Sequence, residues 1–208
     1  MRISAWVICL LLLASAGKAV AAIEDYEDTI VPDERSDSVS ESPGPMGRFV
    51  NRLGLVWDSP TWDLYIPAYT WHNRLMYDKK DTDRYNENPW GLGLGRSMFD
   101  EEGDWHTLYA IGFMDSYNKF EPMVGYGFLK YWYIGDDTGR NSDSDALRLG
   151  LGYTVGLTAR ENYDYIPLPL ALPMVGLEYK KVGIQAVYIP GTYGNGNVLF
   201  TWVHWELP

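Results

Sequence analysis

The stretch LRLGLGYTVGLT, residues 147–158, decides the fold because its apolar residues occupy every second position. Successive side chains of a β-strand point to opposite faces, so the stretch predicts a strand with one wholly apolar face. The other face is half glycine, and its remaining residues are Arg148, Thr154 and Thr158. Soluble sheets also alternate, but they bury the apolar face against a second layer. The half-glycine face favours the narrow, crowded lumen of a small barrel.

Two further stretches, residues 105–114 and 122–132, repeat this alternation. In the second stretch, Val124, Tyr126, Phe128 and Trp132 share one face. The opposite face holds the lumen candidates, which are Met123, Gly125, Gly127 and Leu129. These residues are small and apolar rather than charged, unlike the lining of a water-filled pore. A barrel lined in this way could hold a hydrocarbon chain.

Read along the whole chain, the alternation predicts eight strands. They span about 62–77, 89–99, 104–115, 119–133, 146–159, 166–179, 181–190 and 196–206. Eight is an even number, as in bacterial barrels, and the lengths are near or above the ~9–11 residues that a tilted strand needs to cross a membrane. We therefore expect an all-β fold, namely an eight-stranded antiparallel transmembrane β-barrel with an N-terminal amphipathic helix.

The connections between these strands alternate in length. Short turns are expected at 100–104, 136–145 and 179–181, and longer connections at 78–88, 115–118, 160–165 and 191–195. If both termini lie in the periplasm, the second set faces the outside of the cell.

The N-terminus carries a predicted signal peptide, residues 1–21. Arg2 precedes an apolar run, and Ala19-Val20-Ala21 fits a small-x-small cleavage site. The alternative, a buried N-terminal helix, fits poorly because a polar segment follows at once. The chain's one cysteine, Cys9, lies inside the signal, so the mature chain has no thiol for a disulfide or a metal site.

The segments between the signal and the barrel differ in composition. Residues 22–45 are acidic and rich in Ser and Pro, which predicts a disordered leader. Residues 46–61 carry apolar side chains at helical spacing, which predicts an amphipathic helix in the membrane interface. The alternative is a short helix packed on a soluble domain. Residues 62–208 form the predicted barrel.

Composition narrows the classes of function that the protein could have. The formal net charge of −11 makes nucleic acid an improbable partner. No segment after residue 21 has the apolar length of a membrane helix, yet aromatic residues make up 15% of the chain. Together with secretion, this composition indicates the outer membrane. The three histidines, His72, His106 and His204, have no ligand-like spacing, so we expect no metal and no cofactor.

The predicted topology brings three chemically useful residues to one end of the barrel. His72 lies near the outer end of the first strand, and Asp115 and Ser116 follow the third. These residue types can activate a hydroxyl for acyl transfer. The alternatives are a structural histidine and an Asp-Ser pair that only forms a turn.

Four prolines fall within or at the ends of predicted strands, where they remove ladder hydrogen bonds. Pro67 and Pro89 flank the seam between strands one and two, and Pro173 and Pro190 flank the seam between strands six and seven. Two weakened seams would give two lateral openings from the lipid leaflet into the lumen. The alternative, that they only mark strand ends and bulges, suits Pro89 and Pro190 better than Pro67 and Pro173.

The sequence resembles the lipid A palmitoyltransferase family, PagP, from about residue 57 to about residue 203. The matching stretches are DLYIPAYTWH (63–72), TDRYNENPWG (82–91), DSYNKFEP (115–122), TARENYDYIPLP (158–169) and YIPGTYGNGNV (188–198). The resemblance implies an outer-membrane barrel of a Gram-negative bacterium, with its active site on the extracellular side. It also implies transfer of a palmitoyl or similar chain from the sn-1 position of a glycerophospholipid donor. The acceptor is lipid A, at the hydroxyl of its N-linked hydroxyacyl chain.

The resemblance also assigns residues. The family's active-site His, Asp and Ser fall on His72, Asp115 and Ser116, and the floor of its acyl pocket falls on Gly127. Its gate prolines fall on Pro67 with Pro89 and on Pro173 with Pro190, and a phospholipid-gating tyrosine falls on Tyr193. Asp81 stands where a basic residue is expected, so we expect lipid A phosphates to meet Lys79, Lys80 and Arg84 instead.

In the expected mechanism, His72 is the general base and Asp115 polarises it. It activates either Ser116 or the lipid A hydroxyl itself. The alternatives are a non-enzymatic barrel that binds lipids or stabilises the outer membrane, and an outer-membrane phospholipase that uses water as acceptor. The sequence is compatible with a monomer or a homodimer.

Overall fold

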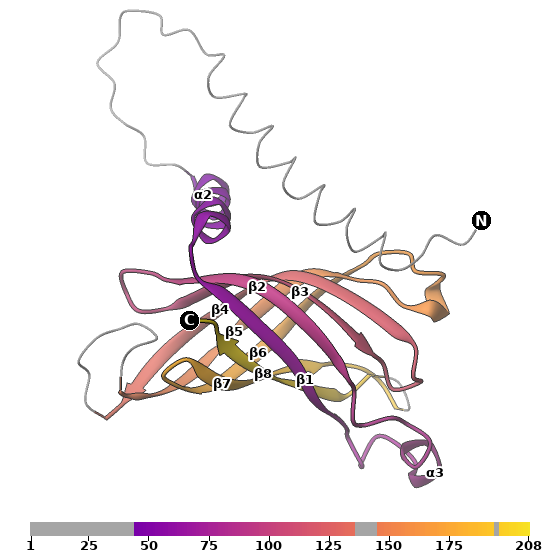
Figure 1. Ribbon diagram of the computed structural model, residues 1–208. Helices are drawn as coiled ribbons and strands as arrows, with labels where there is room; N and C mark the ends of the chain where they lie inside the picture. Colours follow the sequence, from indigo (N-terminus) through magenta and orange to yellow (C-terminus); the bar gives the residue numbers. More distant parts are fainter. Residues whose placement is uncertain (1–43, 136–144, 194–195) are drawn as a thin grey trace, which may run out of the picture.

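The computed structural model describes residues 44–135, 145–193 and 196–208, so the predicted signal peptide and nearly all of the predicted leader lie outside them. Eight antiparallel strands form a closed barrel in chain order, with β1 paired to β8 (Figure 1). The strands are β1 (Trp62–His72), β2 (Gly91–Phe99), β3 (Trp105–Met114), β4 (Phe120–Ile134), β5 (Leu147–Thr158), β6 (Leu168–Tyr179), β7 (Val182–Ile189) and β8 (Val198–Glu206). The predicted fold class is confirmed.

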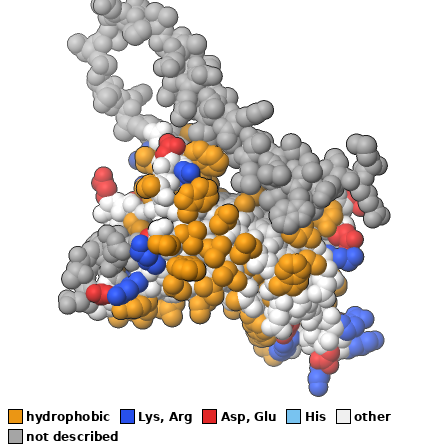
Figure 2. Space-filling model, viewed as in Figure 1, with side chains coloured by type: hydrophobic (Ala, Val, Ile, Leu, Met, Phe, Trp, Pro, Cys, Tyr) orange, Lys and Arg blue, Asp and Glu red, His pale blue; other side chains and the backbone are white. Residues whose placement is uncertain are grey.

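Burial along β5 follows the predicted alternation. Leu149 and Leu151 are exposed, whereas Arg148, Gly150 and Thr154 are buried. Figure 2 shows apolar side chains spread over the outer surface of the barrel between its charged ends. These exposed residues include Leu92, Leu94, Trp132, Leu147, Val175, Leu177 and Ile184. An outward apolar band is what a lipid environment requires of a barrel.

The main difference from the predicted strands is in β1, which ends at His72 rather than at residue 77. Asn73 ends it by accepting a bond from the Leu75 amide at its side chain and one from the Met76 amide at its carbonyl. This local turn competes with the ladder, as Asn side chains often do. The freed chain forms a connection, residues 73–90, that includes the short helix α3 (Lys79–Thr82).

The long connections gather at one end of the barrel, which we call the rim. It comprises residues 73–90, 115–119, 159–167 and, apart from 194–195, residues 190–197. The short turns lie at the opposite end, where the predicted turn at 136–145 falls almost wholly outside the described residues. No helix in the described ranges is long and apolar enough to cross a membrane.

Helix α2 (Pro45–Asp58) confirms the predicted helical spacing and packs against β2 and β3 (Figure 1). Phe49 meets the Tyr126 ring edge-on, with ring centroids 5.3 Å apart. Arg52 lies 3.3 Å from Asp100, and Arg96 donates to the Trp57 carbonyl at 2.6 Å. The position of α2 in the membrane interface stays a prediction.

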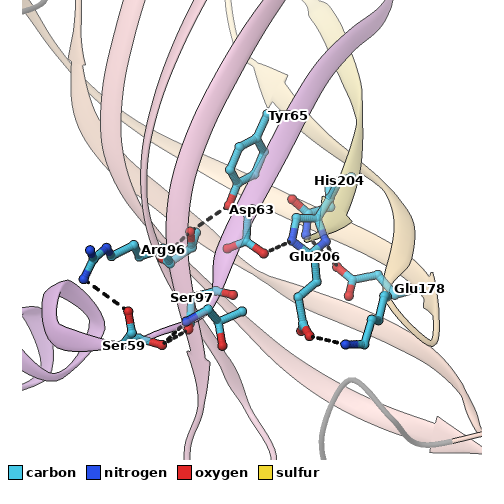
Figure 3. A network of polar contacts seen from close by, with 12 residues as sticks. Ser59, Asp63, Tyr65, Arg96, Ser97, Glu178, His204 and Glu206 are labelled. Carbon is cyan, nitrogen blue, oxygen red and sulfur yellow. Dashed lines mark hydrogen bonds and ion pairs between the residues drawn. The ribbon is translucent and has the colours of Figure 1, made fainter. Parts of the chain in front are cut away.

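The lumen near the short turns is charged, which corrects the expectation of a small, apolar lining. Asp63 and Glu178 both point toward His204 (Figure 3). His204 Nε2 lies 2.8 Å from Asp63, and Arg148 Nη2 lies 3.4 Å from Glu178. All four side chains are buried. Charges are tolerated here because opposite signs are paired.

Large aromatic rings fill the middle of the lumen, and glycines on neighbouring strands make room for them. A Cβ on Gly125 would lie 2.8 Å from the Tyr109 hydroxyl, and one on Gly150 would lie 2.7 Å from the Tyr131 ring. The glycine-rich inner face therefore permits dense packing near the short turns. The open part of the lumen lies toward the rim.

Candidate active site

Ser116 and His72 meet at the rim. His72 is the last residue of β1, and Ser116 lies in the connection between β3 and β4. The Ser116 hydroxyl oxygen lies 3.1 Å from His72 Nε2, across 44 residues of sequence. His72 is only 3% exposed. The topology therefore brings a hydroxyl and an imidazole together at the end of the barrel where the sequence predicted them, and their catalytic roles stay a prediction.

Asp115 makes different contacts from those expected. Its Oδ1 accepts the backbone amides of Tyr117 and Lys119, each at 2.8 Å, and its Oδ2 accepts Arg160 Nη2 at 3.1 Å. Within the described residues its carboxylate has no hydrogen bond to His72. Asp115 instead closes the turn that carries Ser116 and ties it to the 159–167 connection.

Glu87 holds the place expected of Asp115, and sequence reasoning missed it. Its Oε1 lies 3.0 Å from His72 Nδ1 and accepts the His72 backbone amide at 3.3 Å. Its Oε2 accepts Tyr69 at 3.0 Å and Arg74 at 2.6 Å. Burial raises the pKa of Glu87, but the bonds from Arg74, His72 and Tyr69 outweigh it and lower that pKa to about 2. Glu87 is therefore a carboxylate at neutral pH.

The signal for Glu87 was weak in the sequence because the residue lies in a long connection without periodicity. Glu87 reaches His72 only because this connection folds back along β1. The Thr70 amide donates to the Glu87 carbonyl at 2.9 Å, and the Asn86 amide donates to the Ser116 carbonyl at 2.9 Å. These two bonds hold Glu87 between β1 and the turn that carries Ser116.

Two tyrosines enclose the His72 ring. The Tyr77 ring is edge-on to it at 5.2 Å, and the Tyr85 ring is inclined by 30° at 4.7 Å. Burial raises the pKa of Tyr77. The hydrogen bond from Tyr117 and then burial raise the pKa of Tyr85. Both phenols are thus neutral, and their packing restricts rotation of the imidazole.

His72 and Ser116 face a cavity of about 510 Å³ that continues from the rim into the lumen. This volume lies within the range of about 300–1,000 Å³ typical of small-molecule sites. Below the polar mouth its walls are apolar and include Phe113, Met123, Leu172, Val187 and Phe200. The arrangement suits a ligand with one reactive polar end and a hydrocarbon tail.

Gly127 lies deeper than this cavity. It is four residues beyond the lining residue Met123 on the same face of β4, which is roughly 13 Å along the strand. A Cβ on Gly127 would lie 2.9 Å from Thr107 Cγ2 and 3.7 Å from Met174 Sδ. In this structure Gly127 belongs to the packed layer beneath the cavity. A tail reaching it would have to displace flexible side chains such as Met174.

The proline-marked seams have short ladders. Between β1 and β2 the ladder runs from Trp62↔Arg96 to Tyr65↔Gly93, so it ends before Pro67, and Pro89 lies just before β2 begins. Between β6 and β7 it runs from Tyr179↔Val182 to Met174↔Val187, next to Pro173. Pro190 follows the last residue of β7. Passage of lipid through these seams stays a prediction.

The remaining predicted residues lie in the exposed part of the rim. Tyr193 donates to Asp78 at 2.7 Å, which joins the β7–β8 and β1–β2 connections. Lys79 and Lys80 are exposed on α3, and Asp81 pairs with Arg84 at 2.9 Å. Figure 2 shows this basic group at the end of the molecule where Figure 1 places α3.

The Ser116–His72–Glu87 arrangement can activate a hydroxyl. A carboxylate facing Nδ1 requires a proton on that nitrogen, which leaves Nε2 free to accept the proton of Ser116. No group of three or more His, Cys, Asp or Glu residues suited to a metal ion occurs among the residues that the structure describes.

Known proteins resemble this chain over most of its length. The family model described as "PagP: Antimicrobial peptide resistance and lipid A acylation protein PagP" matches residues 52–204. The "Lipid A acyltransferase PagP" of Pectobacterium carotovorum subsp. carotovorum (strain PC1) is 49% identical over 177 residues, covering 84% of this chain and 80% of the relative. That of Photorhabdus asymbiotica subsp. asymbiotica (strain ATCC 43949 / 3105-77) is 44% identical over 207 residues, covering 98% and 97%.

Proposed function

The chain belongs to the PagP family of lipid A acyltransferases, and on that premise we propose the reaction in detail. The protein transfers a palmitoyl or similar chain from the sn-1 position of a glycerophospholipid to lipid A. The acceptor group is the hydroxyl of the N-linked hydroxyacyl chain. The reaction takes place in the outer membrane, with the rim on the extracellular side.

One observation carries this proposal. The Ser116 hydroxyl contacts His72 Nε2 at 3.1 Å, at the mouth of a cavity with apolar walls. A donor ester held at the mouth would place its acyl tail in the cavity and its carbonyl carbon beside the hydroxyl. Such placement converts an encounter between two lipids into an oriented reaction.

In the covalent route, His72 Nε2 takes the proton of Ser116 while Oγ attacks the ester carbonyl carbon. The ester C–O bond breaks, and the released lysophospholipid takes the proton from His72. The lipid A hydroxyl then gives its proton to His72 and attacks the acyl-serine, and Ser116 regains its hydroxyl hydrogen. In the direct route, His72 takes the proton of the lipid A hydroxyl, whose oxygen attacks the phospholipid ester carbonyl carbon without a covalent enzyme intermediate. The sn-1 ester C–O bond breaks, and the leaving lysophospholipid oxygen takes the proton from His72.

Lipids reach the cavity from the side in this proposal. The short ladders at Pro67 with Pro89 and at Pro173 with Pro190 support two lateral openings. Tyr193 gates the phospholipid. Its hydrogen bond to Asp78 supports this role because it links two connections of the rim.

The basic residues of the 73–90 connection bind the phosphates of lipid A. Lys79 and Lys80 present exposed ammonium groups on α3, whereas Asp81 pairs with the Arg84 guanidinium. Gly127 limits the length of the acyl tail once the tail has displaced flexible side chains of the packed layer to which Gly127 belongs.

Mass spectrometry of lipid A tests the proposal. A strain lacking the activity is complemented with wild type, His72→Ala or Ser116→Ala, and barrel folding is checked for each variant. We expect one additional acyl chain on lipid A with wild type and none with His72→Ala. Loss with Ser116→Ala together with a trapped acyl-Ser116 supports the covalent route.

Two outcomes favour the alternatives. Free fatty acid without acylated lipid A would indicate a phospholipase. Lipid A that is unchanged by wild type, without fatty acid release, would indicate a lipid-binding or structural barrel and would contradict the proposal.

A further inference from the structure

We propose that Glu87 is the positioning carboxylate of the reaction: it acts through His72 and holds its imidazole in the tautomer and orientation that activate the attacking hydroxyl. This inference deepens the proposed acyl transfer and rests on it. It replaces the expectation that Asp115 polarises His72. Among the described residues, the Glu87 carboxylate has no hydrogen bond to Ser116 and does not line the cavity, so its effect on chemistry passes through the imidazole.

The contacts of Glu87 divide between its two oxygens. Oε1 faces His72, at 3.0 Å from Nδ1 and 3.3 Å from the backbone nitrogen. Oε2 is held by Tyr69 at 3.0 Å and by Arg74 at 2.6 Å. A carboxylate with one oxygen anchored and the other on an imidazole nitrogen is already ordered, so little entropy is lost when the histidine becomes charged.

The partners of Asp115 oppose the same role for that residue. Both its oxygens are occupied by the Tyr117 and Lys119 amides and by Arg160. Asp115 shapes the turn that delivers Ser116, and Glu87 orients the base that Ser116 meets. The two carboxylates therefore act on different members of the Ser116–His72 pair.

The proton balance follows from this arrangement. With Nδ1–H donated to Glu87, Nε2 is the basic nitrogen, and it becomes protonated when the Ser116 or lipid A hydroxyl attacks. The imidazolium then lies against the Glu87 carboxylate, which stabilises it by charge without taking the proton. When the leaving alkoxide takes the Nε2 proton, the ring returns to the same tautomer.

Other titratable groups surround His72 and shape any pH profile. They are Glu87, Arg74, Tyr77 and Tyr85 from the 73–90 connection, and Asp115, Tyr117, Glu121 and Arg160 across the cavity. Among these groups, Glu87 is the one whose carboxylate oxygen lies within hydrogen-bond distance of His72 Nδ1. The test therefore needs variants that separate its contact with His72 from its other bonds.

The experiment compares Glu87→Gln with Tyr69→Phe in purified, refolded full-length barrels. Glu87→Gln keeps the size of the side chain but removes the charge facing Nδ1. Tyr69→Phe removes one bond to the same carboxylate and leaves the His72 contact in place. We expect Glu87→Gln to lower kcat by about 10²-fold or more with little change in KM for phospholipid. Tyr69→Phe should lose far less kcat than Glu87→Gln, because Arg74 still holds Oε2.

A second control removes a carboxylate elsewhere on the rim. Glu161 pairs with Lys119 at 2.8 Å, and both side chains are about half exposed. Glu161→Gln therefore changes the rim charge by the same amount without touching His72, and wild-type kcat is expected.

Two further readouts exclude a merely structural role. Glu87→Asp keeps the charge and should recover part of the kcat that Glu87→Gln loses. A role that only anchors the loop through Oε2 does not require this recovery. In Glu87→Gln the acidic limb of the pH–rate profile should move to lower pH, because the carboxylate no longer stabilises the protonated imidazole. A loss that Tyr69→Phe reproduces, or an unmoved acidic limb, would overturn the proposal.

The labelling rate of Ser116 by a long-chain alkyl fluorophosphonate separates this inference from the proposed reaction. If wild type labels but acylates no lipid A, the proposed transfer fails, and slower labelling of Glu87→Gln still supports the inference. If wild type transfers acyl chains and Glu87→Gln retains its kcat, the inference fails alone. Absence of both transfer and labelling in folded wild type overturns both.

Discussion

Arg160 Nη2 lies 3.1 Å from Asp115 Oδ2 and thereby joins the connection after β5 to the turn that carries Ser116. The Nε of the same guanidinium lies 3.2 Å from Glu121 at the start of β4. One arginine thus ties together Asp115, in the turn that carries Ser116, and Glu121. The position of Ser116 depends on this cross-link as well as on the local turn.

The first prediction concerns this cross-link. Arg160→Gln should lower kcat for acyl transfer by about 10–100-fold, because a small displacement of Ser116 from His72 is costly. Lys119→Gln is the matched control, since it removes a half-exposed ion pair beside the same turn. Steady-state kinetics with both variants in detergent would check this, and unchanged kcat in Arg160→Gln would contradict it.

The second prediction concerns the depth of the acyl pocket. Gly127→Met should shorten the preferred acyl chain, because a side chain there occupies the layer that a long tail must displace. Met174→Ala should have the opposite effect, since Met174 closes that layer from β6. The measurement is the chain-length profile of the acyl groups transferred to lipid A.

Val124→Met is the control for that prediction because Val124 faces outward on the same strand, so its profile should match wild type. An unaltered profile in Gly127→Met would show that the tail never reaches the packed layer.

The third prediction concerns acid stability. The folded-state pKa of Glu87 is about 2, below its ordinary value of 4.5. A lowered pKa means that the carboxylate contributes stability at pH values above about 4.5 and loses it as the pH falls toward about 2. The difference in unfolding free energy between wild type and Glu87→Gln should therefore be constant near neutral pH and shrink between these values. A difference that persists at pH 2 would count against the prediction.

The fourth prediction concerns the buried charges near the short turns. Glu178→Gln should destabilise the barrel by about 3–5 kcal/mol, because Arg148 and His204 lose a buried countercharge. Urea unfolding in lipid vesicles measures the loss. The exposed Lys180–Asp145 pair provides the control, and Asp145→Asn should cost at most about 1 kcal/mol. Equal losses in the two variants would contradict this.

The sequence predicted most of the fold because strand alternation is a local property. The alternation along 147–158 indicates which side chains face outward and which face the lumen. Eight strands of this kind are an even number, as bacterial outer-membrane barrels have. Strand direction then placed His72 and Ser116 at the same end. Their location at one end follows from topology, so it could be predicted although 44 residues separate them, whereas their contact also depends on the turn at Asp115 and its bond to Arg160.

Other features depended on tertiary structure, since they arise between segments without periodicity or across the lumen. The sequence pointed to Asp115 as the carboxylate beside His72 and missed Glu87, and only the path of the 73–90 connection decides that Glu87 faces Nδ1. Parity placed Gly127 inside, but side chains from other strands decide that the cavity ends above it. The pairing of Arg148 with Glu178 likewise required the β5–β6 register. Local pattern therefore determined the barrel and its two faces, whereas long-range packing decided the partner of the histidine and the depth of the cavity.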